Sequence, residues 1–129
     1  DVYKRQRGLG DVYKRQVYEN KFFIATRDSY PVTELHTLII PKRHFASFFD
    51  MNLDEQSSLH QILKQQRDEI LTIDPTVEAF NLGTNDGIAA GQSIFHLHIH
   101  LFPRRAGDIE NPRGGVRGVI PAKQKYTKK

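Results

Sequence analysis

Residues 96–101 read His-Leu-His-Ile-His-Leu, so three of the chain's six histidines occupy alternate positions. Successive side chains of a β-strand point to opposite faces, so a strand here would place His96, His98 and His100 on one face and the aliphatic residues in the core. Neighbouring histidines would then lie roughly 6.5–7 Å apart. This pattern predicts one small site lined by three imidazoles.

Two kinds of chemistry use clustered imidazoles. Neutral histidines bind zinc or another borderline cation, or one imidazole attacks an electrophile while its neighbours orient it and bind charge. Histidines that bind a metal commonly also contact a carboxylate, and residues 88–106 contain no Asp or Glu. Gln92 and Ser93 lie just upstream and are neutral hydrogen-bonding groups suited to phosphate oxygens. These residues favour nucleophilic catalysis by one imidazole, and metal binding is the alternative.

The composition excludes several classes of protein. The 129 residues include no cysteine, which excludes disulfides, thiol catalysis and zinc bound by cysteine. No run approaches the roughly 18 apolar residues of a membrane span, and no export signal is recognisable, so we expect a cytoplasmic protein with no membrane partner. The net charge of +4 arises mainly in residues 1–16, which hold five basic and two acidic side chains. We therefore expect no specific nucleic-acid partner.

An identical hexamer, Asp-Val-Tyr-Lys-Arg-Gln, occupies residues 1–6 and 11–16. Evolved structural repeats are longer and diverge in sequence. We therefore interpret residues 1–16 as a sequencing or assembly scar and expect them to be disordered. The alternative is a genuine basic arm.

The rest of the chain predicts an α+β fold with an antiparallel sheet of about five strands and one main helix. Apolar runs at 17–26, 36–41 and 77–83, together with the histidine segment, have the composition of strands. Asn52 and Glu55 form a capping-box pattern, and apolar residues at helical spacing follow until Pro75. Most connections are short, which favours antiparallel pairing. We expect residues 106–129 to form an extended tail rich in Gly, Arg and Lys, with one short element.

The segment 96–102 resembles the His-φ-His-φ-His-φ-φ signature of the histidine triad (HIT) family of nucleotide hydrolases and transferases, where φ is an apolar residue. The similarity extends to Asp28–Arg43, which resembles the nucleoside-binding half of that family, and to Asn85–Ser93, which resembles its phosphate-binding loop. It covers roughly residues 17–105, which we assign as the HIT domain. Many members have Pro-Gly where Glu34 and Leu35 precede His36.

The resemblance implies a role for each matching residue. His98 would attack the α-phosphorus of a nucleotide and form a covalent nucleotidyl-histidine. His96 and His100 would flank it, and His36 would support His100. The predicted substrate-binding residues are Asp28 at the ribose and Asn85, Gln92 and Ser93 at the phosphates. No metal and no cofactor are required.

The resemblance implies a nucleotide phosphohydrolase acting on dinucleoside polyphosphates or AMP conjugates, and a homodimer. Histidine at all three triad positions argues against the uridylyltransferase-like branch of the family. A purine-nucleoside phosphoramidase and a non-catalytic nucleotide-binding module are the alternatives. Arg113 and Arg117 in the tail are candidates for polyphosphate binding or solvated charges, and the sequence does not decide between these two roles.

Overall fold

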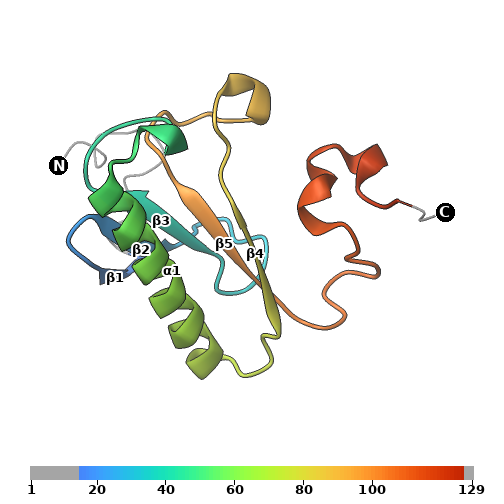
Figure 1. The fold of residues 1–129 in the computed structure, drawn as a ribbon. Helices are drawn as coiled ribbons and strands as arrows, with labels where there is room; N and C mark the ends of the chain where they lie inside the picture. The colour runs from blue at the N-terminus through green and yellow to red at the C-terminus, as the bar shows by residue number, and fades with distance from the viewer. Residues whose placement is uncertain (1–14, 127–129) are drawn as a thin grey trace.

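The computed structural model describes residues 15–126. A five-stranded antiparallel sheet with strand order β1-β2-β3-β5-β4 forms the body, and one long helix lies across it (Figure 1). This arrangement confirms the predicted α+β class. The elements are β1 (Gln16–Glu19), β2 (Phe23–Arg27), β3 (Thr37–Pro41), η3 (Phe48–Asp50), α1 (Leu53–Ile73), β4 (Ala79–Gly83), η4 (Ile88–Ala90), β5 (Ile99–Arg104), η5 (Gly115–Val119) and η6 (Pro121–Lys123).

The predicted N-terminal scar falls almost wholly outside the described residues. Residues 1–14 are not described, and Gln16, the last residue of the repeated hexamer, opens β1. The predicted strand at 17–26 is a hairpin, because β1 and β2 pair antiparallel across a turn at Asn20. The side chain of Asn20 closes this turn by accepting hydrogen bonds from the amides of Phe22 and Phe23.

Helix α1 begins and ends where its sequence predicts. Asn52 accepts from the amide of Glu55, and the Glu55 carboxylate accepts from the amide of Asn52, which completes the capping box. Glu55 is only 1% exposed, and Arg43 donates two hydrogen bonds to its carboxylate at 3.0 and 2.7 Å. The ion pair of Arg43 and Glu55 therefore joins the start of α1 to the segment that follows β3.

At its other end, the helix stops at Ile73, two residues before Pro75.

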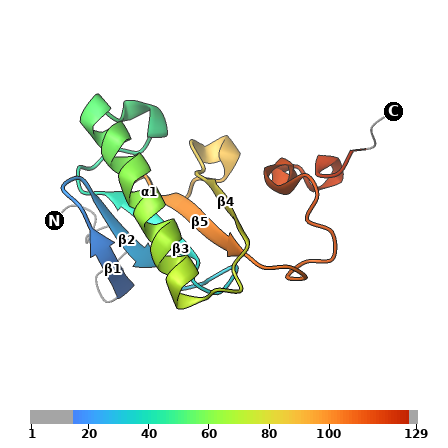
Figure 2. The ribbon, with the colours of Figure 1, turned by 60° about the horizontal axis from the view of Figure 1, so that its bottom comes forward.

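The main core lies between α1 and one face of the sheet. Leu59 and Ile62 of the helix cluster with Phe23, Ile39 and Ile99 of the three central strands. Figure 2 shows α1 crossing this face, so the alternate residues of the strands point to the opposite face. His100 is one of these residues, and Leu38 is its partner on β3. The sheet thus carries its histidine on the side away from the helix.

The tail contains two short 3-10 helices, η5 and η6, where the sequence predicted one short element. It lies beside the sheet beyond β4 (Figure 2). Arg117 donates to the backbone carbonyls of Lys123 and Gln124, and its guanidinium lies 4.9 Å from the ring centroid of Tyr126. The tail is therefore closed on itself by an arginine that the sequence had suggested for polyphosphate. In the described part of the chain, no helix combines the length and apolar character needed to cross a membrane.

Candidate functional site

The histidine segment is only partly a strand. β5 begins at Ile99, so His100 lies in the sheet, whereas His96 and His98 precede it. The ladder with β3 pairs only Thr37–Ile39 with Ile99–Leu101. Beyond this ladder, the carbonyl of Pro41 accepts a hydrogen bond from the ring of His96 at 2.8 Å instead of from a strand amide. The expectation of one continuous strand over all three histidines was therefore wrong in extent.

His96 is fully buried, unlike the other two histidines of the triad. Its Nε2 faces the carbonyl of Pro41, so Nε2 carries the proton and donates. Its Nδ1 then accepts from Nδ1 of His44, which lies 2.8 Å away. Burial is the largest cause that lowers the pKa of His96, and the neighbouring imidazoles of His44 and His98 lower it further. His96 is thus a neutral, anchored ring.

The backbone carbonyl of His96 fixes the tautomer of His98. Nδ1 of His98 lies 3.0 Å from this carbonyl oxygen. A carbonyl can only accept, so Nδ1 carries the proton and Nε2 of the neutral ring carries the lone pair. An imidazole with an unprotonated Nε2 has the electronic form that nucleophilic attack requires.

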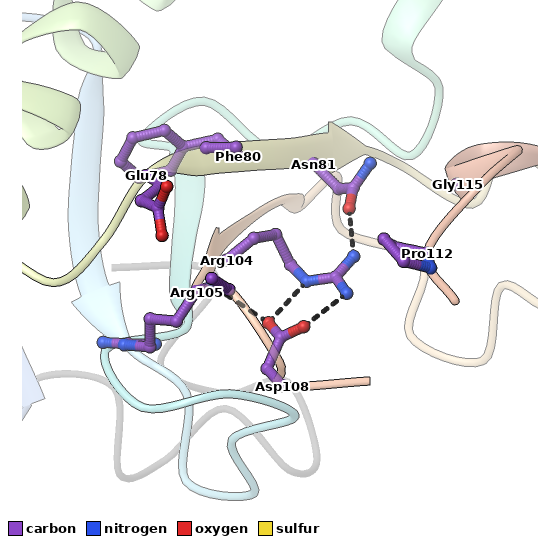
Figure 3. Close-up of a pocket in the computed structure, with 10 residues that line it drawn as sticks. Glu78, Phe80, Asn81, Arg104, Arg105, Asp108, Pro112 and Gly115 are labelled. Carbon is purple, nitrogen blue, oxygen red and sulfur yellow. Dashed lines mark hydrogen bonds and ion pairs between the residues drawn. The ribbon is translucent and has the colours of Figure 1, made fainter. Parts of the chain in front are cut away.

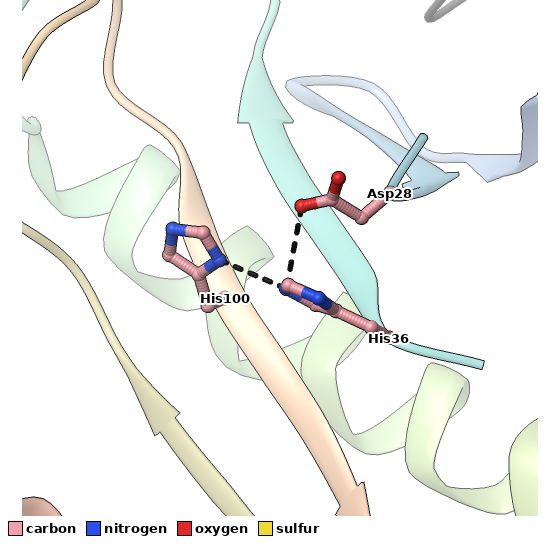
Figure 4. A group of neighbouring side chains, drawn as sticks. All are labelled: Asp28, His36 and His100. Atoms are coloured by element: carbon pink, nitrogen blue, oxygen red, sulfur yellow. Dashed lines mark hydrogen bonds and ion pairs between the residues drawn. The ribbon is translucent and has the colours of Figure 1, made fainter. Parts of the chain in front are cut away.

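Asp28, His36 and His100 come together on the open side of the sheet, as Figure 4 shows. The amide of Val32 donates to Nδ1 of His36, so the neutral His36 ring carries its proton on Nε2. That nitrogen lies 2.9 Å from Nδ1 of His100 and 3.5 Å from a carboxylate oxygen of Asp28. His36 therefore donates to His100, and the proton of the His100 ring lies on Nε2.

Burial holds both of these rings neutral. It is the largest cause that lowers the pKa of His36, while the charge of Asp28 acts in the opposite direction. Burial, with the nearby imidazoles of His98 and His36, lowers the pKa of His100 to about 4, again opposed by Asp28. The ring centroids of His98 and His100 are 5.4 Å apart. Near pH 7, His98 therefore has a neutral neighbour that still holds one N–H to donate.

The turn that carries His36 has an unusual backbone. Leu35 has φ of 70°, in the left-handed region. Many members of the family that this chain resembles have glycine at the same position. Its side chain packs against the cluster of Ile70, Val77 and Leu101, and its carbonyl accepts from the hydroxyl of Thr37 at 2.8 Å. Packing and this hydrogen bond hold the strained residue in place.

The predicted phosphate-binding residues have different environments. Asn85 and Ser93 are exposed, whereas Gln92 is buried. The Gln92 side chain accepts from the amide of Gly87 and donates to the carbonyls of Ala46 and Ile94. Its contacts thus brace the loop that holds Asn85 and Ser93. Direct contact of Asn85, Gln92 and Ser93 with phosphate stays a prediction.

Asp28, His36 and His100 also have the residue types and the spacing of a metal site, with one potential ligand atom of each within 4.8 Å of the others. A metal ion on Nε2 of His36 would need that nitrogen unprotonated. Nδ1 of the same ring already accepts from Val32, so a neutral ring must keep its proton on Nε2. The hydrogen bonds around His36 therefore favour a role in fixing the His100 tautomer over a metal centre.

A separate concave region lies at the β4 edge and has a volume of about 320 Å³ (Figure 3). Arg104 crosses it, donating to both carboxylate oxygens of Asp108 at 2.8 Å and to the side chain of Asn81 at 2.7 Å. Glu78 and Gly115 contribute to its walls. Because Arg104 is already paired with Asp108, this region has the features of a tail anchor and not of an anion site.

Three residues of the site were not predicted from the sequence. His44 donates to His96, Phe102 packs against the rings of His36 and His100 at centroid distances of 4.4 and 5.3 Å, and the hydroxyl of Thr84 donates to the carbonyl of His98 at 2.8 Å. Phe102 could have been found, because it lies two residues after His100 and shares its side of the strand. Nothing in the sequence pattern marks His44 or Thr84.

Comparison with known proteins identifies the family of this chain. The family model described as "HIT domain" matches residues 10–107. The chain belongs to the HIT family. An uncharacterized HIT-like protein of Methanocaldococcus jannaschii is 32% identical over 111 residues, covering 85% of this chain and 84% of that protein.

Two solved HIT structures resemble the chain in both sequence and fold. A HIT family hydrolase from Legionella pneumophila is 33% identical, with a TM-score of 0.59, over 70% of this chain and 81% of that one. A hypothetical histidine triad nucleotide-binding protein from Sulfolobus tokodaii is 40% identical, with a TM-score of 0.58, over 73% of this chain and 62% of that one. Of these two relatives, the first is a hydrolase by name and the second a nucleotide-binding protein by name.

Proposed function

We propose that the chain is a nucleotide phosphohydrolase that attacks the α-phosphate of a dinucleoside polyphosphate or an AMP conjugate through His98. The observation that carries the proposal is the hydrogen bond from Nδ1 of His98 to the carbonyl of His96, which leaves the lone pair on Nε2. The relation of the chain to a HIT family hydrolase and to a HIT nucleotide-binding protein supports a hydrolytic reaction and a nucleotide ligand.

The proposed reaction has two steps. In the first, the Nε2 lone pair of His98 forms a bond to phosphorus, and the bond from phosphorus to the leaving group breaks with its electron pair going to the leaving atom. In the second, a water oxygen attacks the same phosphorus and the bond to Nε2 breaks. The proton lost by water goes to the departed anion or to solvent, and a nucleoside monophosphate is released. His98 ends in its starting form.

The surrounding residues have supporting roles in this proposal. The Nε2–H of His100 is available to a phosphate oxygen, where a fixed donor stabilises the charge that builds during attack. His36 keeps the His100 ring in that tautomer by donating to Nδ1. Asp28 is proposed to bind the ribose hydroxyls, and Asn85 and Ser93 to contact the phosphates. Gln92 is proposed to act there by holding their loop in place.

The decisive experiment is to trap the intermediate. The protein is mixed with an AMP conjugate labelled in the α-phosphate, quenched, digested and analysed by mass spectrometry. A nucleotidyl adduct on His98 supports the proposal and excludes a purely nucleotide-binding module. An adduct on another residue, or no adduct with bound but unhydrolysed nucleotide, would contradict it.

The leaving group is to be identified with a panel of substrates. Turnover of diadenosine tetraphosphate is compared with turnover of an AMP-amine conjugate, which is the substrate class of the phosphoramidase alternative. Faster release of AMP from the polyphosphate supports the proposed class, and faster release from the amine conjugate supports the alternative. We further propose that the chain is a cytoplasmic homodimer, and sedimentation equilibrium of the full chain tests the dimer.

A further inference from the structure

The side chain of Thr84 extends the contact between β4 and β5 beyond the end of their ladder. The backbone pairing ends with Gly83 opposite His100. The next contact is the Thr84 hydroxyl, which donates to the backbone carbonyl of His98 at 2.8 Å. Thr84 therefore bonds directly to the residue on which the proposed chemistry depends.

This contact gives His98 a second fixed point. Its ring is held through Nδ1 by the carbonyl of His96, at 3.0 Å. Its own carbonyl is held by Thr84. His98 precedes β5, so no strand pairing fixes its peptide groups, and a side-chain hydrogen bond takes that role. Restraint at both points limits rotation of the residue that bears the ring.

The loop after Thr84 has anchors of its own. The carboxylate of Asp86 accepts from the hydroxyl of Ser47 and from the amide of Phe48, both at 2.9 Å. The amide of Gly87 donates to the buried side chain of Gln92 at 2.8 Å. Loss of the Thr84 hydroxyl would therefore release His98 while these anchors still hold the loop.

We propose that Thr84 is a positioning residue for the nucleophile. Its hydroxyl fixes the His98 backbone, so that Nδ1 keeps donating to His96 and Nε2 keeps its lone pair toward the substrate. The inference rests on the proposed role of His98. It predicts an effect on the chemical step, with little effect on nucleotide binding.

The test compares isosteric and conservative variants. Thr84→Val keeps the shape of the side chain and removes the hydroxyl, and Thr84→Ser restores the hydroxyl. Thr72→Val is the matched control, because the Thr72 hydroxyl donates to a backbone carbonyl in α1, that of Asp68, at 3.0 Å. Loss of the Thr84 hydrogen bond should lower kcat roughly 5- to 30-fold in Thr84→Val. KM should change less than about twofold. Thr84→Ser and Thr72→Val should retain kcat.

A second readout does not depend on activity. Nitrogen-15 NMR of the nucleotide-free full chain reports which ring nitrogen of His98 is protonated. The wild type and Thr84→Ser should show one tautomer with the proton on Nδ1, and Thr84→Val should show exchange between tautomers. If Thr84→Val fails to fold, Thr84→Ala is measured in its place.

Two results would overturn the inference. One is a Thr84→Val variant with wild-type kcat and an unchanged His98 tautomer, and the other is a Thr84→Ser variant as slow as Thr84→Val. If the wild type forms no adduct on His98, the proposed function fails. The NMR comparison then still decides whether Thr84 orders the ring.

Discussion

Nε2 of His36 lies 2.9 Å from Nδ1 of His100, although 64 positions separate the two residues in the sequence. The contact joins the turn before β3 to the neighbouring strand β5. Its direction follows from the amide of Val32, which occupies Nδ1 of His36 and leaves Nε2 as the donor. One backbone amide thus sets the tautomers of two side chains in series.

We predict that His36→Leu lowers kcat roughly tenfold, the value of one hydrogen bond that orients a catalytic ring, with a smaller change in KM. The leucine removes the donor to His100 while filling the buried space. His36→Gln, which can still donate, should recover part of the loss. Steady-state kinetics with the best substrate of the panel measures both variants. Equal activity of His36→Leu and the wild type would contradict the proposed role of His36 in orienting His100.

His98→Ala should lose at least about two orders of magnitude in kcat, the usual worth of a group that forms a covalent intermediate, and form no nucleotidyl adduct. The ring of His98 is only partly buried, so the variant should keep its fold and unfold at nearly the wild-type temperature. His60→Ala on α1 is the control, because His60 is exposed and distant in sequence from the site. Turnover of His98→Ala near the wild-type rate would rule out the nucleophile assignment.

Stability should fall between pH 6.5 and pH 5. The pKa values of His36, His96 and His100 are lowered by burial, that of His100 to about 4. Below pH 6.5 the unfolded chain therefore binds more protons than the folded chain does. The free energy of unfolding of the protein drops by on the order of 2 kcal/mol between pH 6.5 and pH 5. Urea unfolding at both pH values measures the drop, and His100→Gln should reduce it. A flat profile would show that the buried rings titrate normally.

Arg43→Ala should destabilise the chain by roughly 2–4 kcal/mol at pH 7, because it leaves the carboxylate of Glu55 buried without its partner. The hydrogen bonds from Arg43 lower the pKa of Glu55 in the folded chain. The stabilisation of the fold by this pair is therefore present above the pKa that Glu55 has in the unfolded chain, and it is lost on acidification. The difference between variant and wild type should therefore narrow at about pH 3.5, below the ordinary pKa of a glutamate. Urea unfolding at both pH values tests this, and a difference that does not depend on pH would contradict it.

Gly114→Ala should open the tail. Gly114 has φ of 91°, and an added Cβ would lie only 1.9 Å from the carbonyl oxygen of Gln124. Gly107→Ala is the matched control, since Gly107 has φ of 81° but an added Cβ would meet nothing within 4 Å. Trypsin should cleave after Arg113 or Arg117 faster in Gly114→Ala than in Gly107→Ala. Equal rates would show that the tail does not depend on this contact.

Local sequence signals predicted most of the fold. The capping box of Asn52 and Glu55 marked the start of α1, and apolar runs marked β2 and β3. The extent of the histidine strand was predicted wrongly, because alternation persists where no neighbouring strand remains to pair. Whether Pro41 offers its carbonyl to a strand or to the ring of His96 depends on contacts across 55 positions, and a local pattern does not contain them.

The site was harder to predict than the fold. The spacing of the triad pointed to shared chemistry, but it treated three histidines alike, and only His96 proved fully buried. The contacts of His44 and Thr84 come from segments distant in sequence, and neither residue type is unusual where it stands. Such residues become visible only when hydrogen-bond partners are followed from the central side chain outward.

The backbone of Leu35 bears on how this turn can vary among relatives. Its left-handed φ costs roughly 1 kcal/mol, which is similar to the gain from half-burying a leucine. Glycine at this position would lose the packing and the strain together, so leucine and glycine should be nearly interchangeable. Alanine keeps the strain without the packing, and valine adds a β-branch that this conformation excludes. The position before His36 is thus open to drift between two very different residues and closed to those intermediate in size.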